Sequence, residues 1–442
     1  MSLSANAGNG IVDLTALVNY ANQPIPAYIT EDNTTGNPIT DKGATLGRVL
    51  FYDKRLSRND TIACASCHSQ ARAFSDTATA SSGVNGTTGR HSMRLINARF
   101  ATEVRFFWDE RAANLEAQTT QPIQDHVEMG FSGTLGDPGF PDLVTKLTAI
   151  AEYRVLFAVT FGDPAITEAR VQSALAQFVR SIQSFDSRFD VGRAQVANGN
   201  NPFPNFTAQE NAGKQLFIAA PAQGGAGCAI CHRPPEFDID PASLNNGVIT
   251  KIGGGTDLTN TRSPSLRDLL GVGGQPNGAF MHDGSKVTLA QVIDHYNVIP
   301  ASNTLPANLP SLDNRLRRPG NQVQNLNLTQ QQKNDLAAFL ATLTGTAVYT
   351  DEKWSDPFNA LGQLSLIILP AGEVSIQNNG NGTATVSCQA VAGLQYELRA
   401  SPNLANWTTI ATVAANASGV CSQLVNVSGT QFFRYTYVPP TP

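Results

Sequence analysis

Two long segments of the chain place hydrophobic residues at helical spacing. Apolar side chains recur every three or four positions from Thr167 to Phe185 and again from Thr329 to Leu343, so each segment predicts an amphipathic helix. Gln332 follows Thr329 at the spacing of a capping box, and Thr207 with Glu210 predicts the start of a further helix in the same way. The residues expected on the two buried faces are Val171, Leu175, Phe178, Val179 and Ile182, and Leu336, Phe339, Leu340 and Leu343.

The pattern changes towards the C-terminus, where short runs alternate between apolar and polar residues or are rich in β-branched and aromatic residues. Turn residues separate these runs at a spacing that predicts a small β-sandwich. With Tyr396 and Asn406–Trp407, the region resembles immunoglobulin- or fibronectin-like modules. It holds no cluster of ionisable groups, so we expect an accessory or docking role. The expected strands lie at 394–398, 407–413 and 432–438.

Between the helical segments, stretches rich in Gly and Asn at 81–89 and 253–260 predict long loops, and 197–202 has the composition of a linker. The chain is expected to be mainly α-helical, with two related units that each have an entry helix, a cysteine-containing turn and closing helices. The expected domains are 1–200, 201–358 and, for the β-sandwich, 359–442.

Composition narrows the class of protein. The 442 residues are 41% hydrophobic and 15% charged, as in a globular protein of about two to four domains. No apolar run is long enough to span a bilayer. The net charge of −5, without a Lys/Arg cluster, gives no indication of nucleic-acid binding.

Two copies of Cys-x-x-Cys-His indicate the chemistry. The motif, at Cys64–His68 and Cys228–His232, is the attachment signature of c-type haem. The paired thiols, Cys64 with Cys67 and Cys228 with Cys231, would bond the porphyrin, and His68 and His232 would ligate the two irons from the proximal side. A zinc site requires a second cysteine pair closer in sequence, and a catalytic dithiol requires no histidine at this position. The sequence thus predicts two covalently bound haems, one in each of two cytochrome-c-like domains.

Covalent haem attachment takes place outside the cytoplasm, so we expect a periplasmic or otherwise exported protein. Residues 1–5 have neither a basic start nor an apolar core, so we expect the mature form, preceded by a few residues left by expression. Cys388 and Cys421 are not used by haem, and an oxidising compartment would allow them to pair, a question that geometry decides.

From about residue 40 to 345 the chain resembles the bacterial dihaem cytochrome c peroxidase family, which includes the MauG-like enzymes. Several segments besides the haem motifs carry the resemblance. They are 46–56, Ala73–Asp76, Phe107–Ala112, Leu115–Gln118, Glu128–Gly130, Ser263–Arg267 and His282–Ser285.

The resemblance implies that the His68 haem is the peroxide site and that Trp108 lies between the two haems. Gln118, Pro122 and Glu128 match the residues over the peroxide haem. Cleavage of the O–O bond needs a base that moves a proton from the near oxygen to the leaving one, and Glu128 is the expected base. Without the resemblance, Trp108 would more often be a core residue, and Glu128 would more often be a solvated surface charge.

The sixth ligand of the second haem separates two branches of the family, since the peroxidases have a methionine there and the MauG-like enzymes a tyrosine. Tyr296 lies at the corresponding position, on the apolar face of a helix expected from Thr288. Met281 and His295 are the competing ligands. A phenolate favours oxidised iron, whereas a thioether favours ferrous iron.

Peroxidases that need reductive activation carry a loop histidine that blocks the peroxide haem. This chain has Thr87 at the usual offset from Arg90, and the nearby His91 is interpreted as a hydrogen-bonding residue at the haem edge. If His91 does not reach the iron, the first haem is open at rest. His126 either tunes the pocket or is a polar loop residue.

The resemblance also implies a calcium ion between the haems, held by Asn97 and by the carbonyl oxygens of Asn277 and Ala279. Oxygen ligands suit calcium, but no acidic run supports this site independently.

The expected function is reduction of hydrogen peroxide at the His68 haem, with Trp108 carrying electrons from the His232/Tyr296 haem. The partner is either a small redox protein, a cytochrome c or a copper protein, that donates electrons, or a protein substrate whose aromatic side chains are oxidised in MauG-like chemistry. A non-enzymatic dihaem electron carrier is the third alternative, against which the pocket residues argue.

Overall fold

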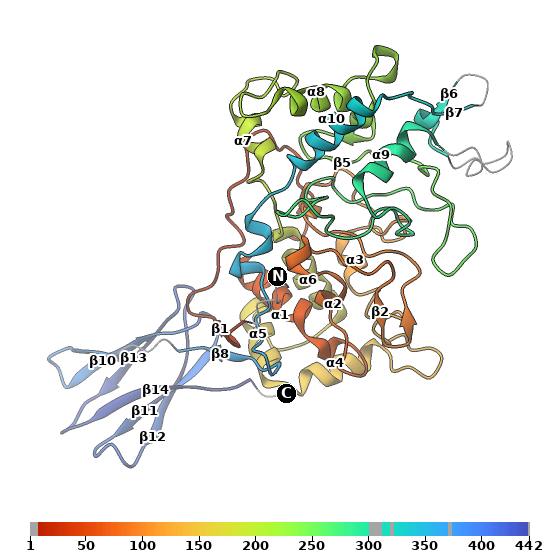
Figure 1. Cartoon of the computed structure of the whole chain (residues 1–442). Coiled ribbons are helices and arrows are strands. Elements are labelled where there is room, and N and C mark those ends of the chain that lie inside the picture. Colours follow the sequence, from red (N-terminus) through yellow and green to blue (C-terminus); the bar gives the residue numbers. More distant parts are fainter. Residues whose placement is uncertain (1–7, 300–311, 319–321, 370–373, 441–442) are drawn as a thin grey trace.

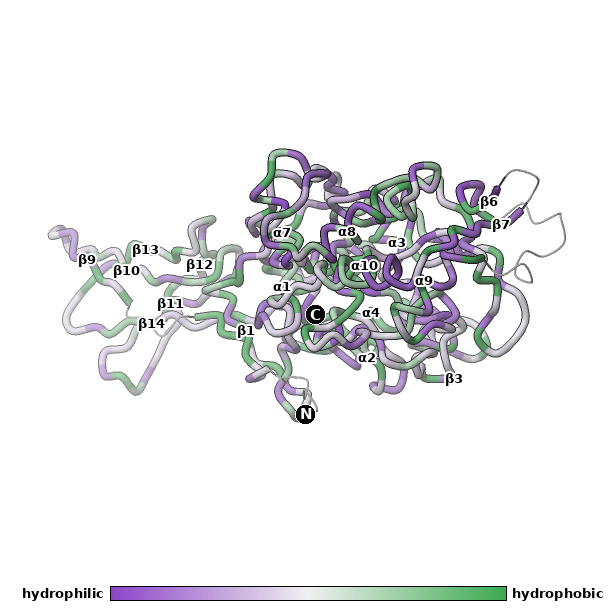
Figure 2. The backbone as a smooth tube through the Cα atoms, turned by 45° about the horizontal axis from the view of Figure 1, so that its top comes forward, coloured by the Kyte–Doolittle hydropathy of each residue, from purple (hydrophilic) through white to green (hydrophobic). Residues whose placement is uncertain are grey.

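The computed structural model describes residues 8–299, 312–318, 322–369 and 374–440. A helical body with many long loops makes up most of the molecule, and a β-sandwich extends from one side of it (Figure 1). Figure 2 shows the same extension from a second direction. No helix in the described residues has both the length and the apolar character needed to cross a membrane.

The first core is built on helix α1 (Asp41–Tyr52), which packs against α6 (Glu168–Ser181). Gly47 allows the close approach, because a methyl group at this position would overlap the carbonyl oxygen of Ala174 on α6. The other elements around this core are α2 (Cys64–Cys67), β2 (Ser82–Gly83), β3 (Gly86–Thr87), α3 (Leu115–Thr119), α4 (Phe140–Thr148) and α5 (Ala151–Phe161).

The second core repeats this arrangement with α8 (Ala208–Ile218) against α10 (Gln330–Ala341). Here Gly213 approaches the backbone of Asp335, as Gly47 approaches Ala174. A cluster of phenylalanines around Phe339 fills the interior. The other elements are α7 (Arg188–Ala194), β4 (His232–Arg233), β5 (Asp238–Ile239), α9 (Leu289–Asn297), β6 (Arg317–Arg318) and β7 (Gln322–Val323).

The chain returns to the first core after α10. Trp354 is buried there, its indole donating to the Ser181 carbonyl oxygen at 3.1 Å, and Tyr52 on α1 donates to the Trp354 carbonyl oxygen. Strand β1 (Ile11–Asp13) then pairs in parallel with β8 (Ser365–Ile367), next to the start of the sandwich. Domain boundaries at 200 and 358 remain predictions.

The C-terminal region forms two three-stranded antiparallel sheets in the orders β13-β10-β9 and β12-β11-β14. Tyr396 and Leu398 on β11 and Val386 on β10 are buried between them. This confirms the predicted β-sandwich at the level of its two sheets. The strands are β9 (Ser375–Asn378), β10 (Thr383–Gln389), β11 (Gln395–Ser401), β12 (Thr408–Ala414), β13 (Val420–Asn426) and β14 (Phe432–Tyr437).

The capping boxes read from the sequence are confirmed at Thr207 and Thr329. The helices expected from Thr167 and Thr288 begin there, with those two residues as their N-caps. The expected end of the first long helix at Phe185 is wrong, because α6 ends at Ser181. The cause is tertiary: the extended residues that follow bond to Asn97, whose backbone N–H donates to the Ile182 carbonyl oxygen.

Candidate active site

A cavity of about 590 Å³ lies beside the first Cys-x-x-Cys-His motif. Cys64 and Cys67 lie on the single turn of α2, and the backbone N–H of His68 closes that turn on the Cys64 carbonyl oxygen at 3.0 Å. Nδ1 of His68 lies 3.2 Å from the carbonyl oxygen of Phe74. This contact orients the ring and leaves Nε2 as the nitrogen for an iron.

A second cavity of about 430 Å³ lies beside the other motif, in the second core. Cys228 begins a short 3-10 turn, Cys228–Ile230, and both Cys231 and His232 line the cavity. Nδ1 of His232 is buried and has no hydrogen-bond partner in the described residues. Both cavities have the size of a cofactor pocket.

The protonation states fit haem attachment better than dithiol redox chemistry. Burial raises the pKa of the Cys64 and Cys228 thiols to about 12, whereas the thiolate of a redox-active Cys pair needs a lowered pKa. Burial also lowers the pKa of His68, and that of His232 to about 4. Both imidazoles are therefore neutral, as an iron ligand must be. The two motifs and cavities together suit two c-type haems.

Trp108 lies in the wall that the two cavities share, since its side chain lines both. Its indole N–H donates to the His91 carbonyl oxygen at 2.7 Å, and its own carbonyl oxygen accepts from the backbone N–H groups of Thr261 and Arg262. The ring of His282 lies against it, with centroids 6.3 Å apart. Trp108 is thus held by segments from both halves of the helical body.

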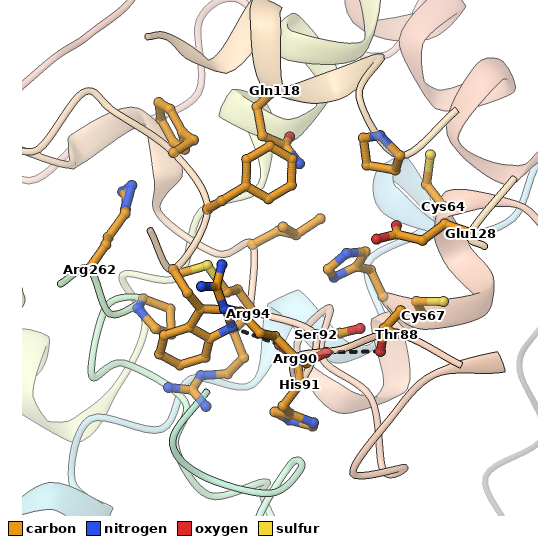
Figure 3. Close-up of a pocket in the computed structure, with 18 of the residues that line it drawn as sticks. Cys64, Cys67, Thr88, Arg90, His91, Ser92, Arg94, Gln118, Glu128 and Arg262 are labelled. Carbon is orange, nitrogen blue, oxygen red and sulfur yellow. Dashed lines mark hydrogen bonds between the residues drawn. The ribbon is translucent and has the colours of Figure 1, made fainter. Parts of the chain in front are cut away.

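Glu128, Gln118 and Pro122 all line the first cavity, together with His68. Figure 3 shows the side chains of Glu128 and Gln118 directed into the same space. Burial, and secondarily the nearby Asp125 carboxylate, raises the pKa of Glu128 to about 7. Its carboxyl group can therefore both release and accept a proton near neutral pH.

Tyr296 and Met281 both line the second cavity with His232. The side-chain amide of Asn246 bridges them, donating to the Tyr296 hydroxyl at 3.0 Å and lying 3.4 Å from the Met281 sulfur. His295 does not line this cavity, and its Nε2 instead lies 2.9 Å from the Asn246 carbonyl oxygen. The geometry leaves Tyr296 and Met281 as the candidate ligands.

Two other histidines near the first cavity have backbone or carboxylate partners. Nδ1 of His91 lies 2.9 Å from the Ala78 carbonyl oxygen, and the labelled ring in Figure 3 lies on the far side of its backbone from Glu128. Nδ1 of His126 lies 2.7 Å from the Asp137 carboxylate. His91 lines both cavities, and its Nε2 lies beside Gly278 without a hydrogen-bond partner in the described residues.

Of the three residues expected to bind calcium, Asn97 and Asn277 use their side-chain amides for other hydrogen bonds in this structure. The Asn97 amide exchanges two hydrogen bonds with the backbone of Ser184, and the Asn277 amide donates to the Asp268 carbonyl oxygen. Ala279 lines the second cavity. In the described ranges no three His, Cys, Asp or Glu side chains gather to supplement these oxygens. Calcium remains a prediction.

Residues 41–197 match the family model of the di-haem cytochrome c peroxidases. The methylamine utilization protein MauG of Methylophilus methylotrophus is 32% identical over 321 residues, which cover 71% of this chain and 85% of that protein. The cytochrome c551 peroxidase of Nitrosomonas europaea is 27% identical over 300 residues, covering 64% and 80%.

The chain belongs to the di-haem cytochrome c peroxidase family. It is accordingly a peroxidase-type dihaem oxidoreductase, and the family implies two haem c cofactors. A solved structure of a MauG-like protein associated with microbial copper homeostasis superimposes with a TM-score of 0.60 at 29% identity, covering 76% of this chain and 99% of that one.

Sequence reasoning assigned no role to four residues that the structure places at the family's two cavities. His282 belongs to a recognised motif, but only the fold shows its ring against Trp108. Asn246 lies in a loop with no motif, so its contact with Tyr296 had no sequence signal. Arg94 and Arg262 are buried and line both cavities, which no local pattern of charge predicts.

Proposed function

We propose that the enzyme reduces hydrogen peroxide at the His68 haem and shares the resulting oxidising equivalents with a His232/Tyr296-ligated haem, as in the MauG-like branch. The reaction consumes two protons and two electrons for each peroxide and yields two waters. Haem, when bound, supplies the iron that binds peroxide and exchanges electrons. The observation that carries the proposal is Glu128, a buried carboxyl group with its pKa near 7 in the cavity of His68.

Glu128 would take the proton from the peroxide oxygen nearer the iron and return it to the leaving oxygen as water. Gln118 presents an amide in the same cavity and would orient the substrate, and Pro122 adds an apolar wall. The Phe74 carbonyl oxygen, bonded to Nδ1 of His68, would increase the electron donation of this imidazole to its ligand.

Sharing between the two sites is supported by Trp108, which lines both cavities and provides an aromatic ring between them. Tyr296 supports the MauG-like form, because its hydroxyl reaches the second cavity and is oriented there by Asn246. His91 lines the first cavity, and the contact of its Nδ1 with the Ala78 carbonyl oxygen supports a first site that is open to peroxide at rest.

A conventional peroxidase, supplied with electrons by a small cytochrome c or a copper protein, is the second candidate. The Met281 sulfur favours it, since it lines the same cavity as Tyr296 and contacts the same Asn246 amide. For both candidate functions, we propose export to the periplasm and a redox-protein partner. We also propose that the C-terminal β-sandwich is an immunoglobulin- or fibronectin-like accessory module.

The deciding experiment adds stoichiometric peroxide to the fully ferric holoprotein and follows visible and near-infrared absorption and EPR. Loss of both ferric EPR signals with a new near-infrared band is the expected result. A reaction that begins only after one haem has been reduced would contradict the MauG-like proposal and support the conventional peroxidase. No reaction in either state would contradict both.

A further inference from the structure

Among the described residues, Arg94 is a buried cation without a carboxylate partner. The residue is 8% exposed. Its Nη2 donates to the Ser265 carbonyl oxygen at 3.2 Å, and its Nε has no hydrogen-bond partner in the part of the chain that the structure describes. Burial lowers the pKa of Arg94 to about 10, which still leaves it protonated at neutral pH. Burying a charge in this way is costly unless an opposite charge lies beside it.

The other buried arginines of the described chain each face a carboxylate. Arg267 forms an ion pair with Asp190 at 2.9 Å, and Arg180 pairs with Glu116. Arg262 lies 4.0 Å from Asp238. The nearby Asp268 carboxylate attracts Arg94 electrostatically but does not form an ion pair with it. Its oxygen instead accepts hydrogen bonds from the backbone N–H of Gly345 and the hydroxyl of Tyr349. We therefore expect an anion beside Arg94 that the described residues do not supply.

The position of Arg94 indicates what that anion is. Arg94 and Trp108 each line both cavities, so Arg94 lies in the wall that the two cavities share. Each haem carries two carboxylate groups at one edge of the porphyrin. We propose that Arg94 is the shared counter-ion of haem carboxylates from both sites. The inference rests on both cavities holding haem, as proposed above, but not on peroxide turnover.

A fixed positive charge at this wall raises the reduction potential of a nearby iron, because it destabilises the more positive ferric state. Replacing Arg94 by a neutral side chain should therefore lower the midpoint potential of both haems. Arg94→Lys retains the charge and should leave the potentials close to those of the wild type.

The test is spectroelectrochemical titration of the holoproteins of wild type, Arg94→Gln and Arg94→Lys, with haem content measured first. Arg154→Gln is the matched control, since Arg154 also bonds to carbonyl oxygens, those of Thr148 and Pro440, but does not line either cavity. We expect the ferric-to-ferrous equilibrium constant of each haem to fall about tenfold in Arg94→Gln, which is 59 mV per electron. Unchanged potentials, or a change at one haem alone, would overturn the proposal.

If Arg94→Gln does not assemble with haem, resonance Raman spectra of the wild type and Arg94→Lys test whether residue 94 contacts the haem carboxylates. The bands of the carboxylate side chains of the haem respond to hydrogen bonding, so they should shift between these proteins and stay unchanged in Arg154→Gln. Identical bands in wild type and Arg94→Lys would overturn the proposal. Failure of the wild type itself to bind two haems would instead contradict the proposed function.

Discussion

The indole N–H of Trp108 donates to the backbone carbonyl oxygen of His91 at 2.7 Å. The backbone N–H of His91 in turn donates to the His282 carbonyl oxygen, also at 2.7 Å. One short chain of hydrogen bonds thus joins the expected bridging tryptophan, the loop histidine and the His-Asp-Gly segment of the second half. The tryptophan is fixed where both cavities meet, so its role in electron sharing can be tested by substitution.

Trp108→Phe should slow electron transfer between the two sites while keeping an aromatic ring in the wall that the two cavities share. The smaller ring loses the hydrogen bond to His91 and part of the contact with His282. We expect transfer of oxidising equivalents to the second haem to slow by about tenfold or more, equivalent to about 1.4 kcal/mol in the barrier. Freeze-quenched EPR after peroxide addition measures this as persistence of the second ferric signal. Equal decay of both signals at the wild-type rate would contradict the bridging role.

Glu128→Gln should reduce peroxide turnover by about 100-fold or more, because the amide cannot transfer the proton. The resting haem spectra should remain those of the wild type. Turnover kinetics and absorption spectra of the same samples check both points. Activity near the wild-type level would show that another group is the base.

The pH dependence of peroxide reaction should follow Glu128. Its pKa is raised to about 7, so the carboxyl group is protonated below that pH and becomes the base above it. The rate should therefore rise between about pH 6 and pH 8 in the wild type. The same stopped-flow series on Glu128→Gln is the control and should be flat over this interval. A rise of equal size in the variant would assign the titration to a different group.

Tyr296→Phe and Met281→Leu distinguish the two candidate ligands of the second haem. If the Tyr296 oxygen is the ligand, Tyr296→Phe changes the ferric spectrum of that haem and Met281→Leu does not. The two side chains share the Asn246 amide, so Asn246 is left unchanged in both variants. Resonance Raman detection of an iron–phenolate vibration gives an independent readout. The reverse pattern would support the conventional peroxidase.

Gly47→Ala and Gly213→Ala should each destabilise the protein, by about 1–3 kcal/mol or more, since the new methyl group overlaps a carbonyl oxygen of the facing helix. Thermal unfolding followed by circular dichroism measures the loss. Gly273→Ala is the matched control, because no atom lies within 4 Å of a methyl group placed there. A control as destabilised as the other two would argue against helix contact as the cause.

Cys388 and Cys421 should form a disulfide under oxidising conditions. Their thiols are unbonded in the structure, but the residues are directly opposite each other on the antiparallel strands β10 and β13. That places the Cα atoms about 4.5–5.5 Å apart, within the range of a disulfide. The bond should stabilise the sandwich by roughly 2–4 kcal/mol. Alkylation and mass spectrometry of the oxidised protein check it, and two alkylated cysteines would contradict it.

The sequence by itself determined the chemistry and most of the local structure. The spacing of Cys64, Cys67 and His68, and of their counterparts in the second motif, specifies haem attachment without reference to the fold. The helix caps at Thr207 and Thr329 were also predicted from the sequence, because a cap depends on side chains within one turn of the chain.

Only the tertiary structure decided which distant residues share a cavity. The resemblance implied the position of Trp108, but the position of Arg94 beside it follows from the fold alone. Segments from both halves, more than a hundred positions apart in the chain, form the wall in which both residues lie. The raised pKa of Glu128 has the same origin, since burial sets it and burial depends on the whole fold. Local pattern determines which groups are available, and long-range packing determines their neighbours, solvation and charge.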